Sequence, residues 1–342
     1  MNVRLCALTL AAALVCAAAP RLPAQTYTVT RVDTLGGDGG WDYLALDTAG
    51  HRLFVARQDR DMVVDPGTGR LIGEIPGLDR AHGIAFAYAQ GHGFATSGAD
   101  STVTMFDLRT LAVLRRTPAA VDDDAILYDP ASRHVFTMNG DAGSSSVIDP
   151  VTGANVGTIP LGGKPEFGVT DGHGRLFVNI EDSSQIVEVD ARHERVVRRW
   201  SIAPCRGPTG LAIDVAHHRL FSGCRSGVMA ISDASRGRLV TTVPIGQGVD
   251  AARFDAGTQL AFASCGEGVI TVIHEDDPNH FRVVATVPTQ QGARTMQLNP
   301  VSHALYTVTA QFGPAPAPAQ GRRSRPPILP GTFMLLELAS RP

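Results

Sequence analysis

The 342-residue sequence predicts an all-β protein, a seven-bladed β-propeller made of four-stranded antiparallel blades. Three observations predict this fold. A strand, turn and strand pattern recurs seven times, its copies are spaced by about the length of one propeller blade, and the strand missing from the last copy is present before the first. Alternating apolar residues between Gly, Pro and Asp predict strands in every repeat.

Residues 1–24 are predicted to be a signal peptide. Arg4 supplies the positive charge, and residues 5–19 form an apolar run that is too short to anchor the chain in a bilayer. Cleavage is expected after Ala24 rather than after Ala19. No second apolar stretch of spanning length follows in the sequence. We therefore expect a periplasmic or secreted protein without a transmembrane segment.

One propeller domain is predicted over residues 25–342. Each repeat begins with an Asp-type turn, followed by a basic or His residue and a strand similar to Leu-Phe-Val. The copies are DTAGHRLFVA, AYAQGHGFAT, DPASRHVFTM, DGHGRLFVNI, DVAHHRLFSG, DAGTQLAFAS and NPVSHALYTV, which begin at residues 47, 87, 129, 171, 214, 255 and 299. Two further runs follow in each unit, such as MVVDPGTG at 62–69 and RLIGEIPG at 70–77. Four runs in each unit predict four strands in each blade.

The ends of the chain predict how the ring closes. The last unit stops after its third run, at residues 332–338, and lacks a fourth. Residues 27–35 (YTVTRVDTL) precede the first unit as every fourth run precedes the next unit. The N-terminal strand should therefore complete the last blade, and this closure removes the open sheet edges that promote aggregation.

The repeat resembles that of the YVTN-repeat, YncE-like family of exported bacterial seven-bladed propellers. LFVA, VFTM, LFVN and LYTV stand where the family has Tyr-Val-Thr-Asn, and Phe177 to Asn179 is the best match. The resemblance extends over essentially all of residues 25–342. It implies the propeller fold and an interaction platform rather than a particular reaction.

A ring of polar residues is predicted at one mouth of the central channel. The first strand of every propeller blade lines the channel, so positions five residues before each repeat anchor should be equivalent. These positions hold Asp42, His82, Asp124, Glu166, Thr209, Asp250 and Arg294, and the preceding positions include Trp41 and Asp123. We interpret this ring as a ligand-binding site, with Trp41 either available to stack on a ligand or serving as a packing residue. The alternative is that these side chains are solvated or cap backbone amides.

The acidic members of this ring are candidate metal ligands. Like charges held close together perturb one another's pKa or recruit a cation. Carboxylate oxygens with one imidazole suit a hard or borderline divalent cation. The candidate ligands are Asp42, His82, Asp124, Glu166 and Asp250. No other cofactor is indicated.

Three cysteines follow the predicted signal peptide. Antiparallel pairing in the fifth blade should bring Cys205 close to Cys224, and an oxidising compartment would permit a disulfide between them. Cys265 is left without a partner, as a buried or a reactive thiol. The spacing of the three residues matches no metal-binding motif.

The last blade contains a Pro-rich insertion at residues 310–331, with Arg322, Arg323 and Arg325 close together. Such a segment is expected to be extended and to project from the face that carries the polar ring. It is either a tolerated surface insertion or a lid or partner-binding arm.

The sequence favours a non-catalytic binding or scaffold protein, monomeric, with a small molecule or another protein as its partner. A metal-dependent hydrolase or lactonase-like enzyme that uses the acidic rim is the alternative. The sequence contains no C-x-x-C-H, G-x-S-x-G or H-E-x-x-H motif and no phosphate-binding glycine loop. The formal net charge of −3 and the acidic rim argue against nucleic-acid binding.

Overall fold

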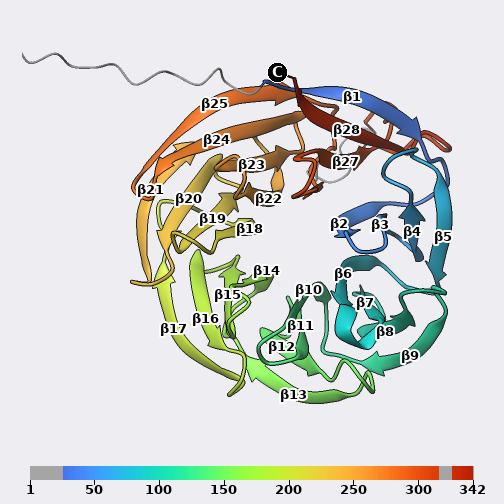
Figure 1. Cartoon of the computed structure of the whole chain (residues 1–342), viewed down its shortest axis with the longest axis horizontal. Coiled ribbons are helices and arrows are strands. Elements are labelled where there is room, and N and C mark those ends of the chain that lie inside the picture. The colour runs from blue at the N-terminus through green and yellow to red at the C-terminus, as the bar shows by residue number, and fades with distance from the viewer. Residues whose placement is uncertain (1–25, 316–325, 342) are drawn as a thin grey trace, which may run out of the picture.

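The computed structural model describes residues 26–315 and 326–341. It confirms the seven-bladed β-propeller, with seven four-stranded antiparallel sheets arranged as a ring around a central channel (Figure 1). Among these residues no helix is long and apolar enough to cross a membrane. The predicted signal peptide, residues 1–24, lies outside the described residues.

The first strand of each blade lies nearest the channel, and the later strands follow outward (Figure 1). Blades 1 to 3 consist of β2 (Trp41–Asp47), β3 (Arg52–Arg57), β4 (Arg60–Val64) and β5 (Leu71–Pro76); β6 (Ala81–Ala87), β7 (His92–Ser97), β8 (Thr102–Asp107) and β9 (Val113–Pro118); and β10 (Asp123–Asp129), β11 (His134–Asn139), β12 (Ser144–Ile148) and β13 (Asn155–Pro160). In blade 2 the 3₁₀ turn η1 (Tyr88–Gln90) joins β6 to β7.

Blades 4 to 6 repeat the arrangement. They consist of β14 (Pro165–Thr170), β15 (Arg175–Ile180), β16 (Gln185–Asp190) and β17 (Arg195–Ser201); β18 (Pro208–Asp214), β19 (Arg219–Cys224), β20 (Val228–Asp233) and β21 (Arg238–Pro244); and β22 (Val249–Asp255), β23 (Leu260–Cys265), β24 (Val269–Asp277) and β25 (His280–Pro288). Blade 7 consists of β26 (Met296–Leu298), β27 (Leu305–Thr309), β28 (Met334–Arg341) and β1 (Thr26–Thr34).

The ring closes through the N-terminal strand, as the sequence predicts. β1 pairs antiparallel with β28, in a register that runs from Thr26 opposite Arg341 to Thr34 opposite Met334. Tyr27 is buried, its ring meets that of Phe262 in blade 6 edge-on at 5.1 Å, and its hydroxyl donates a hydrogen bond to a backbone carbonyl at 2.9 Å. β1 therefore completes blade 7 and also packs against the neighbouring blade.

The recurring aromatic residue of the repeat forms the core between blades. It stands on the second strand, where the side chain points into the layer between adjacent sheets and is almost entirely buried. The seven residues are Phe54, Phe94, Phe136, Phe177, Phe221, Phe262 and Tyr306. The outermost strands, by contrast, are mostly exposed, with a single buried residue near the end of β5 and of β13, because they meet solvent.

The repeated Asp residues make turns. Asp47 Oδ1 accepts a hydrogen bond from the Gly50 amide at 2.8 Å, and Asp129 Oδ2 accepts one from the Ser132 amide at 2.7 Å. Such contacts satisfy backbone amides in the tight connection between the first two strands of a blade. The anchors at this end of the channel therefore have a structural role.

Cys205 and Cys224 are joined by a disulfide in blade 5, with their Cα atoms 5.6 Å apart. Cys265 is free and buried, and burial raises the pKa of its thiol to about 12. A thiol in this state is unreactive at neutral pH, because the thiolate is the reactive species.

Reduction of the Cys205–Cys224 bond should lower the free energy of unfolding by about 3 kcal/mol, because it releases a constraint on the unfolded chain. The protein should first be expressed in an oxidising compartment. Non-reducing peptide mapping should then recover the linked pair with Cys265 as a free thiol. Two free thiols at 205 and 224 in that preparation would contradict the prediction.

Candidate functional site

A large cavity opens at one mouth of the channel, where the first strands of the blades begin. Its volume is about 1120 Å³. We call it the mouth pocket. Among its walls are Trp41, Asp42, Tyr43, His82, Asp124, Glu166, Asp250 and Arg294. The structure therefore brings seven of the nine predicted site residues to one cavity.

A repeated irregularity in the strands aims these side chains at the mouth. In six blades the pairing of the first two strands shifts register just after the first strand begins, for example between Trp41 and Leu44 and between Asp123 and Ile126. A β-bulge of this kind bends the strand and turns a side chain away from its regular direction. It allows two consecutive residues, Asp42 and Tyr43, to line the same pocket.

Three adjacent blades meet at His82. Its Nδ1 atom contacts an Asp42 carboxylate oxygen and lies 3.3 Å from Asp124 Oδ1. One candidate ligand atom from each of Asp42, His82 and Asp124 lies within 4.8 Å of the other two. Asp124 Oδ1 is buried without a hydrogen-bond partner among the described residues. Two carboxylates thus converge on one imidazole nitrogen, a position that either a proton or a cation can occupy.

The opposite side of the His82 ring is fixed by packing. A Cβ atom added to Gly98 would lie 2.7 Å from His82 Nε2, so this glycine leaves the space that the imidazole needs. The ring therefore presents Nδ1, and not Nε2, to the two carboxylates.

Burial and mutual repulsion disfavour full ionisation of the carboxyl groups in the mouth pocket. Burial, and then the charges of Asp42 and Glu166, hold the pKa of Asp124 well above its usual range. Burial raises the pKa of Glu166 to about 8, with further contributions from Glu181 and Asp250. Carboxyl groups of the mouth pocket therefore retain protons near neutral pH.

Arg294 offsets part of this negative charge. Its Nε donates to Asp250 Oδ2 at 2.7 Å, and its Nη2 donates to the Trp41 carbonyl at 2.9 Å. Although burial opposes its charge, Asp250 and Asp42 raise the pKa of Arg294 above the ordinary value. Burial nevertheless keeps the pKa of Asp250 raised. The single positive charge of Arg294 does not balance the negative charge of the carboxylates in the mouth pocket.

Trp41 is mainly a packing residue. Its ring lies 5.5 Å from Phe333 and 6.1 Å from Phe312, and the Arg294 guanidinium lies over it at 5.7 Å. The loop that precedes it is held by the buried Arg57, which donates hydrogen bonds to the carbonyls of Asp38 and Gly39 at 2.9 and 2.8 Å. This support fixes the position of Asp42, the next residue.

Two of the predicted site residues do not line the mouth pocket. Thr209 is fully buried, and its hydroxyl donates to the Val249 carbonyl at 2.9 Å, which ties β18 to β22. Asp123 is also fully buried, and burial raises the pKa of its carboxyl to about 9. Neither residue is part of the wall of the mouth pocket, and both side chains are buried.

The rim of the mouth pocket also carries positively charged side chains that the repeat pattern did not predict. Arg225 pairs with Glu181 and lies 3.7 Å from Glu166, and Lys164 lies 3.7 Å from Asp122. These residues lie outside the first strands, in loops and turns, so the spacing of the repeat could not select them. Lys164 stands out as the single lysine of the sequence, but that fact alone does not indicate a role at the site.

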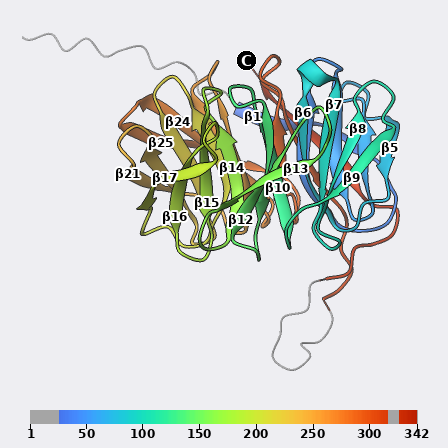
Figure 2. The same ribbon diagram turned by 90° about the horizontal axis from the view of Figure 1, so that it is seen from below.

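The described ends of the insertion at 310–331 border the same cavity. Phe312, Pro326, Ile328 and Pro330 line the mouth pocket, and Phe312 forms a β-bridge with Ile328. These segments extend from one face of the ring, at the bottom of Figure 2, and η1 lies on the other face. The described ends of the insertion therefore lie at the face that the sequence predicts. Arg322, Arg323 and Arg325 fall outside the described residues.

Comparisons with known proteins support the fold alone. No family model matches the chain, and no curated protein matches it. Among solved structures it is similar to the hydrazine synthase of Kuenenia stuttgartiensis, with a TM-score of 0.69 and 14% identity over 78% of this chain and 91% of that one. It is also similar to U3-55K, with a TM-score of 0.71 and 11% identity over 90% of this chain and 97% of that one.

Proposed function

We propose that this chain is a binding propeller whose mouth pocket holds a divalent cation and presents it to a ligand or protein partner. The observation that carries the proposal is the convergence of Asp42, His82 and Asp124 from three blades, with Asp124 Oδ1 buried and without a hydrogen-bond partner in the described part of the chain. A cation at this point would replace the proton between the imidazole nitrogen and the carboxylates.

Electrostatics supports the same assignment. Carboxylates that are buried close together are stabilised in their ionised form by a nearby positive charge. Glu166 and Asp250 lie in the same pocket and would add oxygen ligands directly or through water. The rim cations Lys164 and Arg225 lie beside this acidic centre and could orient an anionic part of the ligand.

Calorimetric titration of chelator-treated protein with Mn²⁺ and Ca²⁺ tests the proposal. The wild type should bind at least one of these ions with saturation, and the ion should raise the melting temperature. Binding should strengthen from pH 6 to pH 9, because Glu166 and Asp124 must lose protons before they bind a cation. Asp124→Asn combined with Glu166→Gln should remove both effects.

A matched control is Asp59→Asn combined with Glu74→Gln, which neutralises two exposed carboxylates that pair with Arg60 outside the pocket. This control should bind the ion as the wild type does. Absence of saturable binding to the wild type, or equal binding by the Asp124→Asn, Glu166→Gln variant, would overturn the proposal.

Metal-dependent hydrolysis is the second candidate. It is favoured by Glu166, whose pKa of about 8 suits a general acid or base at neutral pH. Incubation of the metal-loaded protein with a panel of aliphatic lactones tests this activity. Turnover that Glu166→Gln abolishes, with metal binding retained, would establish catalysis.

Export to the periplasm or outside the cell belongs to this proposal. The charged and apolar segments at residues 1–24 and the disulfide in blade 5 support it. Membership of the YVTN-repeat, YncE-like family is supported by the repeated strand at Phe177 to Asn179 and its counterparts. A monomer is expected, because the ring leaves no blade incomplete.

A further inference from the structure

A second cavity occupies the other half of the channel. Its volume is about 320 Å³, and it is reached from the face opposite the described ends of the insertion, residues 310–315 and 326–331. We call it the axial pocket. Tyr43 lines both cavities and stands edge-on to Phe167 at a ring distance of 5.1 Å, so these rings lie between the two halves of the channel.

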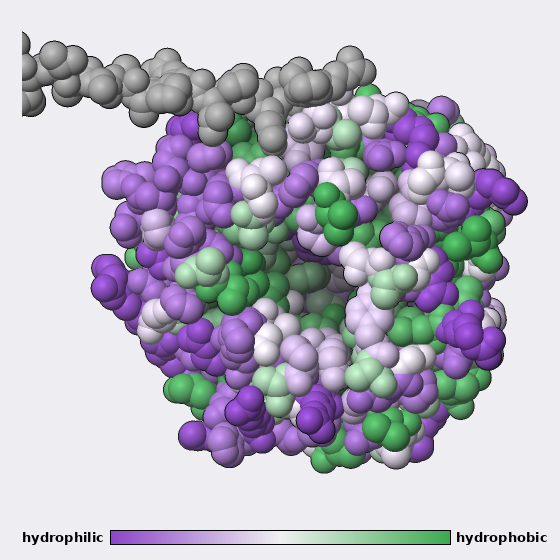
Figure 3. Space-filling view, in the orientation of Figure 1, coloured by the Kyte–Doolittle hydropathy of each residue, from purple (hydrophilic) through white to green (hydrophobic). Residues whose placement is uncertain are grey.

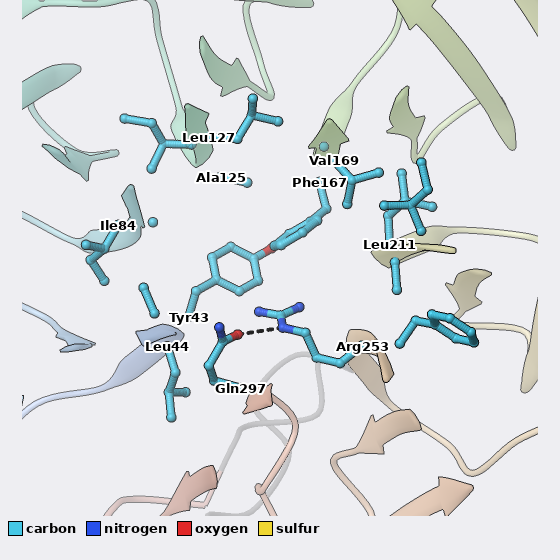
Figure 4. Close-up of a pocket in the computed structure, with 17 residues that line it drawn as sticks. Tyr43, Leu44, Ile84, Ala125, Leu127, Phe167, Val169, Leu211, Arg253 and Gln297 are labelled. Carbon is cyan, nitrogen blue, oxygen red and sulfur yellow. Dashed lines mark hydrogen bonds between the residues drawn. The ribbon is translucent and has the colours of Figure 1, made fainter. Parts of the chain in front are cut away.

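The walls of the axial pocket are mostly aliphatic. Leu44, Ile84, Leu127, Val169 and Leu211 line it, each from a different blade (Figure 4). The space-filling view shows the centre of this face hollowed, with hydrophobic residues deep in the hollow (Figure 3). A concave apolar surface with few polar groups is the usual form of a small-molecule site.

Arg253 places one positive charge in these apolar surroundings. Its Nε donates to Gln297 Oε1 at 2.6 Å, its Nη1 donates to the Ala252 carbonyl at 2.7 Å, and its guanidinium lies over the Phe167 ring at 5.5 Å (Figure 4). No carboxylate of the described residues forms an ion pair with it. Burial lowers the pKa of Arg253 to about 10, so the group remains charged at neutral pH.

The hydrogen-bonding capacity of this pair is only partly used. A guanidinium has five N–H groups, and Arg253 directs two of them to Gln297 and Ala252. Gln297 accepts through its oxygen, which leaves its amide nitrogen as a further donor. A carboxylate matches such a set of donors, because it accepts two parallel N–H groups from one arginine.

We propose that the axial pocket binds a small monocarboxylate with an apolar chain. The carboxylate would accept hydrogen bonds from Arg253 and Gln297, and the chain would lie against the partly exposed side chains of Leu127 and Val169. The single cation matches a monoanion rather than a dianion. The site shares only Tyr43 with the mouth pocket and does not depend on the proposed cation.

Titration calorimetry with hexanoate, hexan-1-ol and hexylammonium tests this proposal. Hexanoate should bind with saturation and at least about tenfold more tightly than the other two, since only hexanoate supplies a charge-assisted partner for Arg253. Arg253→Met should weaken hexanoate binding by about tenfold or more. Arg238→Met is the matched control, because Arg238 is exposed on an outer strand, and it should bind normally.

Ala45→Leu gives a second variant that keeps the charge. Ala45 is half-buried and lines the axial pocket, so the larger side chain should occupy space that the ligand needs. Melting curves should first show that both variants are folded. Equal binding of the three probes to the wild type, or hexanoate binding unchanged in both variants, would overturn the proposal. Asp124→Asn with Glu166→Gln should still bind hexanoate, which separates this site from the mouth pocket.

Discussion

A protein that begins at Gly36, and therefore lacks β1, should lose most of its folding stability. β1 supplies the fourth strand of blade 7, and its removal leaves the β28 edge without a partner. The truncation removes the backbone pairing between β1 and β28 together with the buried side chain of Tyr27. It also exposes β28 as an edge strand, and such a strand promotes aggregation. We expect the melting transition to broaden and to shift by more than about 10 °C, as measured by circular dichroism.

Point variants separate the packing of β1 from its backbone pairing. Tyr27→Ala should lower the free energy of unfolding by about 3–5 kcal/mol, the usual cost of removing a large buried aromatic side chain. Thr30→Ala on the same strand should cost less than about 1 kcal/mol, because Thr30 is exposed. A shortened protein that melted like one beginning at Thr26 would show that the ring does not depend on β1.

Asp124→Asn combined with Glu166→Gln should stabilise the cation-free protein at pH 8. Both carboxyls have raised pKa values in the folded state, so ionisation at high pH opposes folding. For Glu166 the stabilising contribution is fully present below the ordinary pKa of 4.5 and is lost as the pH rises through about 8. The neutral amides cannot ionise and should avoid this loss.

Urea unfolding from pH 5 to pH 9 measures the effect. The free energy of unfolding of the wild type should fall over this range relative to the double variant, by on the order of 3 kcal/mol. The control pair Asp59→Asn and Glu74→Gln should follow the wild type, because exposed ion pairs contribute little. A double variant that was less stable than the wild type at pH 8 would show that these carboxylates stabilise the fold.

The local pattern of the sequence determined the architecture. Each repeat contains its own turn residues, its alternating strands and a core aromatic such as Phe54 or Phe136, so the blades and their number follow from short-range information. The pairing of β1 with β28 was also predictable, because a unit with three strands requires a fourth. The equivalence of the repeats likewise predicted that Asp42, His82 and Asp124 would share one mouth of the channel.

Only the tertiary structure decided which polar residues reach a cavity and what charge they carry there. The bulges at the start of the first strands turn Asp42 into the mouth pocket, whereas Asp123 and Thr209 are buried outside its walls. The rim position of Arg225 depends on contacts between blades, and so does the lack of a carboxylate partner for Arg253 among the described residues. The repeat period contains no information on these contacts. The pKa of Glu166 likewise depends on burial and on neighbours brought together by ring closure, because electrostatic interactions follow distance in space and not separation along the chain.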